Sequence, residues 1–191
     1  MALAVPPKLR ELDVGVMAAD QINQKTCAAL IDLHKDSKNL AVQGRIQHDN
    51  SNVVDMQIRQ TEVFVINEYF RWVDELIVNC AIEANKQFNF NLTGLLERPQ
   101  LLKYTAPSQG YDWHLDIGLG DSSTRKISIS ILLNDDYKGG DLAFFTDGES
   151  HIKPDKGTAV AFPSYLPHRV TPLTEGTRWS LVCWIAGEPF R

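Results

Sequence analysis

The sequence predicts a mainly β protein with helices packed outside a β-sandwich, and a change of pattern along the chain supports this. In the N-terminal half, apolar residues recur at the spacing of amphipathic helices. After Pro99, short apolar runs of period two alternate with turn residues, as in sandwiches and barrels. The 191 residues hold no internal repeat or Gly/Ser-rich linker. We therefore expect one domain over 1–191, with a helical part over about 1–98 and a β core over about 99–188.

Two helices are expected in the N-terminal part. Residues 19–35 place apolar side chains at approximate helical spacing, and Asp20 is a candidate N-cap. The helical pattern is clearest over 68–88, where the apolar positions follow one face. Residues 40–60 are polar and irregular, and we expect a loop there, either a lid over a site or an ordinary surface connection.

The part of the chain after Pro99 is expected to form strands. Asn, Asp, Gly and Pro residues separate the apolar runs, as chain reversals require. The expected strands are Leu101–Thr105, Ile127–Leu133, Asp141–Phe145, Gly157–Phe162, His168–Thr171 and Thr177–Ile185.

The composition argues against several classes of partner. The formal net charge is −5, from 19 basic and 24 acidic side chains, so no general attraction to nucleic acid or anionic lipid is expected. No apolar run is long enough to span a bilayer, and the N-terminus lacks a signal-peptide core. Cys27, Cys80 and Cys183 form no CxxC motif and suggest neither zinc nor disulfides. We expect a cytoplasmic location, with no nucleic-acid or membrane partner.

One motif in the β region offers metal-ligand chemistry. His114 and Asp116 are two residues apart, so they project from the same side of an extended strand, and His168 adds a second imidazole. Two histidines and one carboxylate on one face of an octahedral ion leave open positions, as in non-haem Fe(II) oxygenases. Each piece alone also fits a surface pair or a partly buried histidine. The other histidines are not expected to bind metal: His34 on a helix surface, His48 in the loop and His151 in a strand flanked by turns.

Arg178 strengthens this interpretation. It lies ten positions after His168, and period two puts it on one strand face with Ser180, Val182 and Trp184. A guanidinium on an apolar strand is costly to bury unless it meets an anion, and a carboxylate is its best match. The partner is either a bound carboxylate ligand or an internal Asp or Glu in a structural ion pair.

In order and spacing, the His-x-Asp pair, the later histidine and the arginine resemble the 2-oxoglutarate and Fe(II)-dependent dioxygenases, within the prolyl 4-hydroxylase-like group. The resemblance covers roughly residues 98–188. Shorter matching segments are Leu102-Lys103-Tyr104, Gly139-Gly140-Asp141, Pro154-Asp155-Lys156-Gly157 and Ala161-Phe162-Pro163.

For fold and metal, the resemblance implies a double-stranded β-helix, or jelly roll, with the metal near the open end of the roll. It implies that His114, Asp116 and His168 hold Fe(II), and it names no catalytic residue beyond these ligands.

For the co-substrate, the resemblance implies that Arg178 binds the distal carboxylate of 2-oxoglutarate, with Ser180 and the phenol of Tyr104 as further donors. Tyr104 has a structural alternative, which is to pack a sheet edge with its hydroxyl at the surface. Many relatives carry a tyrosine where Leu132 or Leu133 stands, so the co-substrate pocket can be bonded differently here. A requirement for ascorbate stays open.

For function, the resemblance implies that dioxygen is used to hydroxylate an amino acid side chain, with peptidyl proline as the first expectation. Two alternatives stay open: a hydroxylase of a free amino acid or small metabolite, and a non-catalytic metal-binding jelly-roll module. Asp116 argues against halogenation, which needs a small residue there, and Trp184 stands where related nucleic-acid demethylases carry a second arginine. Candidate substrate-groove residues are Tyr111, Trp113 and Trp184.

Overall fold

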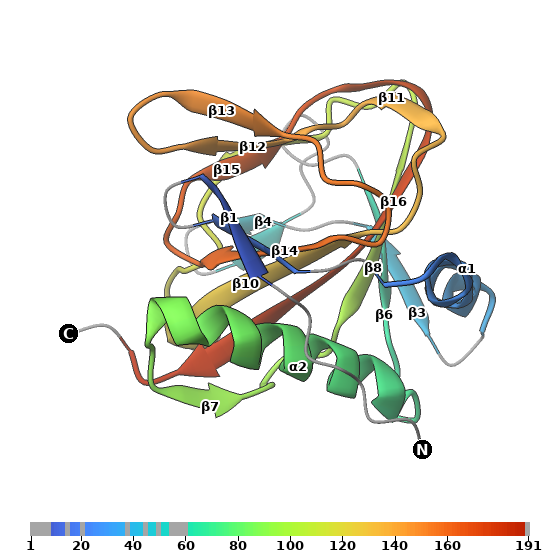
Figure 1. Cartoon of the computed structure of the whole chain (residues 1–191). Helices are drawn as coiled ribbons and strands as arrows, with labels where there is room; N and C mark the ends of the chain where they lie inside the picture. The colour runs from blue at the N-terminus through green and yellow to red at the C-terminus, as the bar shows by residue number, and fades with distance from the viewer. Residues whose placement is uncertain are drawn as a thin grey trace.

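Two antiparallel sheets pack face to face in this protein, and helices cover the outer side of the larger sheet (Figure 1). The structure is a computed structural model that describes residues 9–13, 16–19, 22–36, 39–43, 46–48, 51–53 and 61–189. Leu142 and Phe144 of the smaller sheet pack against Val160 and Phe162 of the larger one, so the space between the sheets holds a core of its own. This arrangement confirms the jelly roll that the sequence predicted.

The larger sheet contains the longest strands and the centre of the fold. Its strands lie in the order β1 (Leu9–Asp13), β2 (Val16–Ala19), β14 (Ala159–Pro163), β10 (Arg125–Leu132), β16 (Leu173–Gly187), β8 (Gln100–Thr105), β6 (Glu62–Val65) and β3 (Leu40–Gln43). Two further strands, β7 (Leu92–Gly94) and β11 (Tyr137–Gly139), also pair with β16.

The alternation of residue types in β10 and β16 gives the larger sheet two different faces. The odd-numbered residues from Ile127 to Ile131 and from Trp179 to Ile185 join the main hydrophobic core. The residues that alternate with them along the strands, among which are Ser128, Arg178 and Ser180, face the smaller sheet. Successive side chains of a strand point to opposite faces, so one sheet supplies both an apolar core and a polar cavity wall.

The smaller sheet lies over this polar face. Its strand order is β13 (Glu149–Ile152), β12 (Leu142–Phe145), β15 (His168–Val170) and β9 (Tyr111–His114). A separate two-stranded ribbon consists of β4 (Ile46–His48) and β5 (Ser51–Val53).

Two helices complete the main core. Helix α2 (Arg71–Phe88) packs along the outer face of β10, β14 and β16 through an apolar stripe that contains Val73 and Ile77. Helix α1 (Gln24–Asp32) contributes Cys27 and Leu30 to the same core and continues into the short 3-10 helix η1 (Leu33–Lys35). None of the helices in the described ranges has the length and hydropathy needed to cross a membrane.

Some expectations about the N-terminal part were wrong. The cap of α1 is Asn23, whose side chain accepts a hydrogen bond from the Thr26 amide at 2.9 Å, and not Asp20. Both residue types cap helices equally well, so composition does not decide between them. The expected loop over 40–60 contains β3, β4 and β5, while 44–45, 49–50 and 54–60 lie outside the described residues.

The N-terminal part is also less helical than expected over 1–98, because β1, β2, β3, β6 and β7 all belong to the larger sheet. These strands are short and their partners are distant in sequence, so little local periodicity marks them. The six strands expected after Pro99 are all present as β8, β10, β12, β14, β15 and β16, with ends that shift by up to four residues. Strands β9 and β13 carry His114 and His151, which were expected in extended segments, whereas the short strand β11 was not expected.

We predict that L181A lowers the free energy of unfolding by about 2–5 kcal/mol, because Leu181 is fully buried at the centre of β16 and its loss leaves a cavity. Denaturant unfolding measures the effect. The control is L96A, since Leu96 is 68% exposed and its removal should change stability by no more than about 0.5 kcal/mol. Equal losses in both variants would contradict this description of the core.

Candidate active site

A cavity of about 670 Å³ lies between the two sheets. The polar face of the larger sheet forms its floor, and residues of β9, β15 and the segment after β9 form much of the opposite wall. Its lining includes every residue assigned above to metal or co-substrate: Tyr104, His114, Asp116, His168, Arg178 and Ser180. The fold therefore gathers residues that are far apart in the sequence around one space.

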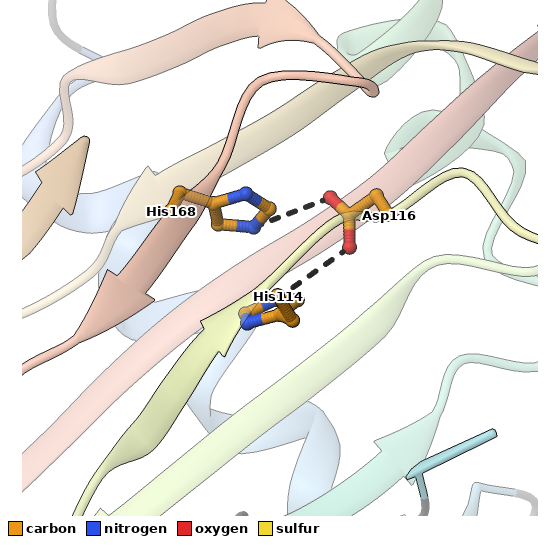
Figure 2. Close-up of side chains that lie close together, drawn as sticks. All are labelled: His114, Asp116 and His168. Carbon is orange, nitrogen blue, oxygen red and sulfur yellow. Dashed lines mark ion pairs between the residues drawn. The ribbon is translucent and has the colours of Figure 1, made fainter. Parts of the chain in front are cut away.

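His114, Asp116 and His168 converge on one point of this cavity (Figure 2). His114 ends β9 and pairs across the ladder with His168, the first residue of β15. Asp116 follows two residues after His114, with its carboxylate oxygens 3.8 Å from His114 Nε2 and 3.4 Å from His168 Nε2. Among the described residues this is the one group of three or more potential metal ligands.

Both imidazoles are oriented for metal binding. The Nδ1 atom of His114 lies 2.7 Å from the Asp112 carbonyl, and that of His168 lies 2.9 Å from the Leu166 carbonyl. A carbonyl oxygen only accepts hydrogen bonds, so in each ring Nδ1 carries the proton. Each Nε2 atom faces Asp116, so it is the ring nitrogen that can coordinate a metal when it carries no proton.

The Asp116 carboxylate is kept in its ionised form. Burial raises its pKa, but the imidazoles of His168 and His114 and hydrogen bonds from Ser128 and Trp184 lower it by more, so the net shift is downward. The Ser128 hydroxyl donates to Asp116 Oδ2 at 2.6 Å. An anionic oxygen donor is thus available beside the two nitrogen donors.

This donor set fits a divalent ion. Adjacent ligands of an octahedral ion at about 2.1 Å stand roughly 3 Å apart, and the two measured separations, 3.4 and 3.8 Å, are only slightly larger. Two imidazoles and one carboxylate could therefore hold such an ion after a small inward movement.

Arg178 lies deeper in the cavity and has an incomplete set of partners. It is 3% exposed, it donates to Ser180 Oγ at 2.9 Å, and it also hydrogen-bonds the hydroxyl of Tyr137. No carboxylate among the described residues forms an ion pair with it, and its Nε has no hydrogen-bond partner there. The expected alternative of an internal ion pair is therefore not found in the described part of the chain.

Tyr104 stands beside this guanidinium, with the Arg178 Cζ atom 5.8 Å from its ring centre. Tyr104 is 1% exposed and its hydroxyl is buried without a hydrogen-bond partner in the described structure. The alternative in which its hydroxyl lies at the surface is therefore wrong. Buried polar atoms without partners are rare, and here a phenol and a guanidinium nitrogen share one cavity.

The aromatic candidates separate into two groups. Tyr111 and Trp184 line the cavity, and the Tyr111 ring stacks on His114 with centroids 3.5 Å apart. Trp113 is not part of the cavity lining, because it alternates with His114 along β9 and instead packs under Arg169 and against Phe145.

Three groups of site residues were not expected from the sequence. Arg125 stacks on Trp184 at 4.0 Å, donates to the Asp116 carbonyl at 3.0 Å and forms two hydrogen bonds with Glu97. The other unexpected residues are Ser128 and Ser164 beside Asp116, and Tyr137 beside Arg178. The alternation of serine and isoleucine in β10 was a visible signal for a polar face, whereas the remaining contacts join distant segments.

Comparison with known proteins agrees with this site. Residues 99–186 match the model of the 2OG-Fe(II) oxygenase superfamily, where 2OG is 2-oxoglutarate. A PKHD-type hydroxylase of Picosynechococcus sp. is 32% identical over 111 residues, which cover 56% of this chain and 51% of that protein. A PKHD-type hydroxylase of Thermosynechococcus vestitus is 26% identical over 178 residues, covering 89% and 75%. The chain spans about half the length of several of the curated relatives it matches.

Solved structures share the fold. A Pseudomonas putida prolyl-4-hydroxylase superposes with a TM-score of 0.68 at 21% identity, covering 91% of this chain and 93% of the other. A Trichoplax adhaerens prolyl hydroxylase, solved with a hypoxia inducible factor peptide fragment, gives 0.70 at 18% identity, covering 91% and 84%. The resemblance that the motifs predicted is therefore confirmed: the chain is similar in sequence to 2-oxoglutarate and Fe(II)-dependent oxygenases over residues 99–186, and its fold is that of the prolyl 4-hydroxylase-like structures.

The cysteines are set apart from this site. All three are buried free thiols, and none lines the cavity. Burial raises the pKa of Cys27, raises that of Cys80 to about 11 and raises that of Cys183 to about 12. Only a thiolate reacts or binds metal readily, so these thiols are inert in the folded protein.

We predict that a disulfide reagent such as DTNB reacts slowly with the native protein at mildly alkaline pH and titrates three thiols after unfolding in urea. The colour released over time measures both. Rapid reaction of the native protein would show that a thiol is accessible and ionised, which would contradict the burial described here.

Proposed function

We propose that this chain is an Fe(II)- and 2-oxoglutarate-dependent dioxygenase that hydroxylates an amino acid side chain, with peptidyl proline as the first candidate. The observation that carries the proposal is one cavity with two complementary features. It holds three convergent potential metal ligands and, deeper, a buried arginine that has no carboxylate partner among the described residues. The first feature suits a divalent metal and the second suits a carboxylate ligand.

In this proposal His114, Asp116 and His168 hold the iron. Three protein ligands leave the remaining positions of an octahedral ion for the co-substrate and dioxygen. When bound, iron and 2-oxoglutarate would supply the oxidation: 2-oxoglutarate loses CO2 and becomes succinate, which takes up one oxygen atom of O2, and the other oxygen atom is inserted into a substrate C–H bond. The protein's part is to orient these groups inside the cavity.

Arg178 is proposed to bind the distal carboxylate of 2-oxoglutarate. A bound carboxylate would accept hydrogen bonds from the guanidinium and would offset the cost of burying its charge. Tyr104 and Ser180 are proposed as additional donors, because the buried Tyr104 hydroxyl lacks a partner and Ser180 already contacts Arg178. The relatives' tyrosine is replaced by Leu132 or Leu133 here, and Tyr137 from β11 provides a hydroxyl to Arg178 instead.

The substrate proposal rests on the cavity and on the relatives. A volume of about 670 Å³ lies within the usual range of roughly 300–1,000 Å³ for ligand sites, so a side chain can enter beside the co-substrate. Tyr111 and Trp184 are proposed substrate contacts because they line the cavity, and Trp113 is a weaker candidate because it does not. The similar Trichoplax protein was solved with a peptide, which favours a peptide over a free amino acid. The three free cysteines favour a reducing compartment such as the cytoplasm.

The substrate class can be tested by supplying the protein, loaded with Fe(II), with 2-oxoglutarate, O2 and either proline-containing peptides or free amino acids, with and without ascorbate. Mass spectrometry then identifies products that have gained one oxygen atom. A hydroxylated prolyl residue supports the proposal. Products only from free amino acids would favour a metabolite hydroxylase, and the absence of any product or succinate would favour a non-catalytic module.

We predict that H114A, D116A and H168A each abolish turnover and weaken Fe(II) binding strongly, because each removes one of three protein ligands. Anaerobic Fe(II) titration and succinate analysis measure the two effects. The matched control is H151A, since His151 is a surface histidine paired with Asp141 and Glu149, and it should behave as the wild type. Full activity in any of the three ligand variants would exclude the proposed ligand set.

We predict that R178A raises the KM for 2-oxoglutarate by roughly 10- to 100-fold, because it removes charged hydrogen bonds worth about 1.5–3 kcal/mol. Steady-state kinetics with varied 2-oxoglutarate measures the change, and Fe(II) affinity should stay close to that of the wild type. R71A, at an exposed position of α2, controls for general loss of positive charge. An unchanged KM in R178A would show that the co-substrate binds elsewhere.

A further inference from the structure

The carboxylate of Asp116 lies at the end of a hydrogen-bonded chain of two serines. Ser128 Oγ is 2.6 Å from Asp116 Oδ2, and Ser164 Oγ is 3.0 Å from Ser128 Oγ. An ionised carboxylate only accepts hydrogen bonds, so Ser128 uses its single hydroxyl proton on Asp116. The bond between the serines must then run from Ser164 to Ser128, which gives the chain one direction.

Ser164 holds the backbone of Asp116 as well. Its carbonyl accepts the amide of Asp116 at 3.0 Å and that of Ile117 at 3.1 Å, and its own amide donates to the Lys126 carbonyl at 2.9 Å. Ser164 directly follows β14, and Lys126 lies in β10. The segment that contains Asp116 is therefore tied to the edge of two strands in the larger sheet.

These contacts are needed because the ladder of the smaller sheet does not reach Asp116. Strand β9 ends at His114, and the pair formed by His114 and His168 is the last pair of the β9–β15 ladder on the side of Asp116. The two histidines are thus placed by strand pairing, while Asp116 lies in a bend after the strand. Its position depends on Ser164 for the backbone and on Ser128 for the side chain.

The burial of Ser128 and Ser164 indicates that their two hydroxyl groups have a role. Ser128 is 2% exposed and Ser164 is fully buried. An alanine in either place would avoid the cost of desolvating a hydroxyl, which is only offset when the hydrogen bonds are made. Both serines make theirs, and in both cases the bonds lead to Asp116.

We infer that Ser128, oriented by Ser164, is a positioning residue that fixes the Asp116 carboxylate and thereby strengthens metal binding at the His114, Asp116 and His168 site. The inference rests on the proposed function, because it assumes that these three residues are the ligands. Outer hydrogen bonds to metal ligands typically change affinity or activity by about 10–100-fold when removed. The Trp184 indole, which also hydrogen-bonds Asp116, remains in place in the serine variants and should keep the loss within that range.

The test is a titration of the metal-free full chain with Co(II), whose visible absorption reports both affinity and coordination and needs no turnover. S128A should bind Co(II) roughly 10- to 100-fold more weakly and with altered absorption bands. S128T keeps the hydroxyl and should restore affinity to within about threefold of the wild type. S164A should show a smaller loss, because it removes only the outer bond of the chain.

The matched control is S130A. Ser130 lies two residues along the same face of β10 and lines the same cavity, but within the described chain the side-chain donors to Asp116 are Ser128 and Trp184. S130A should therefore bind Co(II) as the wild type does. Circular dichroism and thermal unfolding of the metal-free variants separate lost affinity from lost fold.

The outcomes can be told apart. Wild-type affinity in S128A, or an equal loss in S128T, would overturn the inference while leaving the proposed ligands intact. If S128A does not fold, the Co(II) affinity of S164A is the test. A lower affinity than that of the wild type supports the positioning role of the two serines, and wild-type affinity overturns the inference. Failure of the wild type to bind Co(II) would instead contradict the proposed metal site itself.

Discussion

The antiparallel pairing of β10 with β16 is the interaction on which the rest of the structure depends. In its register Ser128 lies opposite Trp184 and Ile129 lies opposite Cys183, so pairs that contain one serine alternate with entirely apolar pairs along two neighbouring strands. The apolar pairs pack against α2, and the pairs that contain a serine form the cavity floor. A slip of one residue would exchange the two faces and would place Arg178 in the core. Core stability and site geometry are thus consequences of the same register.

The cavity places opposite charges in two separate positions. At one position, the Asp116 carboxylate is surrounded by two imidazoles and two hydrogen-bond donors, which offset the cost of its burial. At the other, Arg178 is almost fully buried with two hydroxyl partners and no described carboxylate. A ligand that has a metal-chelating end and a distal carboxylate would satisfy both positions at once, and 2-oxoglutarate has this form. The positions of these two charged groups therefore restrict the length and polarity of a co-substrate more closely than the fold alone does.

Sequence reasoning found what depends on local spacing. His114 and Asp116 were expected on one side of a strand because they are two residues apart, and alternation placed Arg178, Ser180 and Trp184 on one face. It did not find the contacts that join distant segments: the hold of Ser164 on Asp116, the Tyr137 hydroxyl beside Arg178, or the strands before Pro99 that extend the larger sheet. Such contacts depend on which distant segments lie next to each other in the fold, and the local periodicity of the sequence does not indicate this. The expectation that Asp20 caps α1 failed for another reason, since Asn23, which caps as well as an aspartate, stands three residues further on.

The central claim is that this cavity oxidises 2-oxoglutarate with iron, and one measurement tests it most directly. The protein, purified without oxygen and loaded with Fe(II) and 2-oxoglutarate, is exposed to O2 with candidate peptides, and succinate is measured by mass spectrometry. We expect succinate from the wild type in proportion to O2 consumed, and none from the same protein loaded with Zn(II), which fits such a site but is not redox-active. Succinate formation that does not depend on Fe(II), or no succinate from the iron-loaded protein with any substrate, would contradict the account.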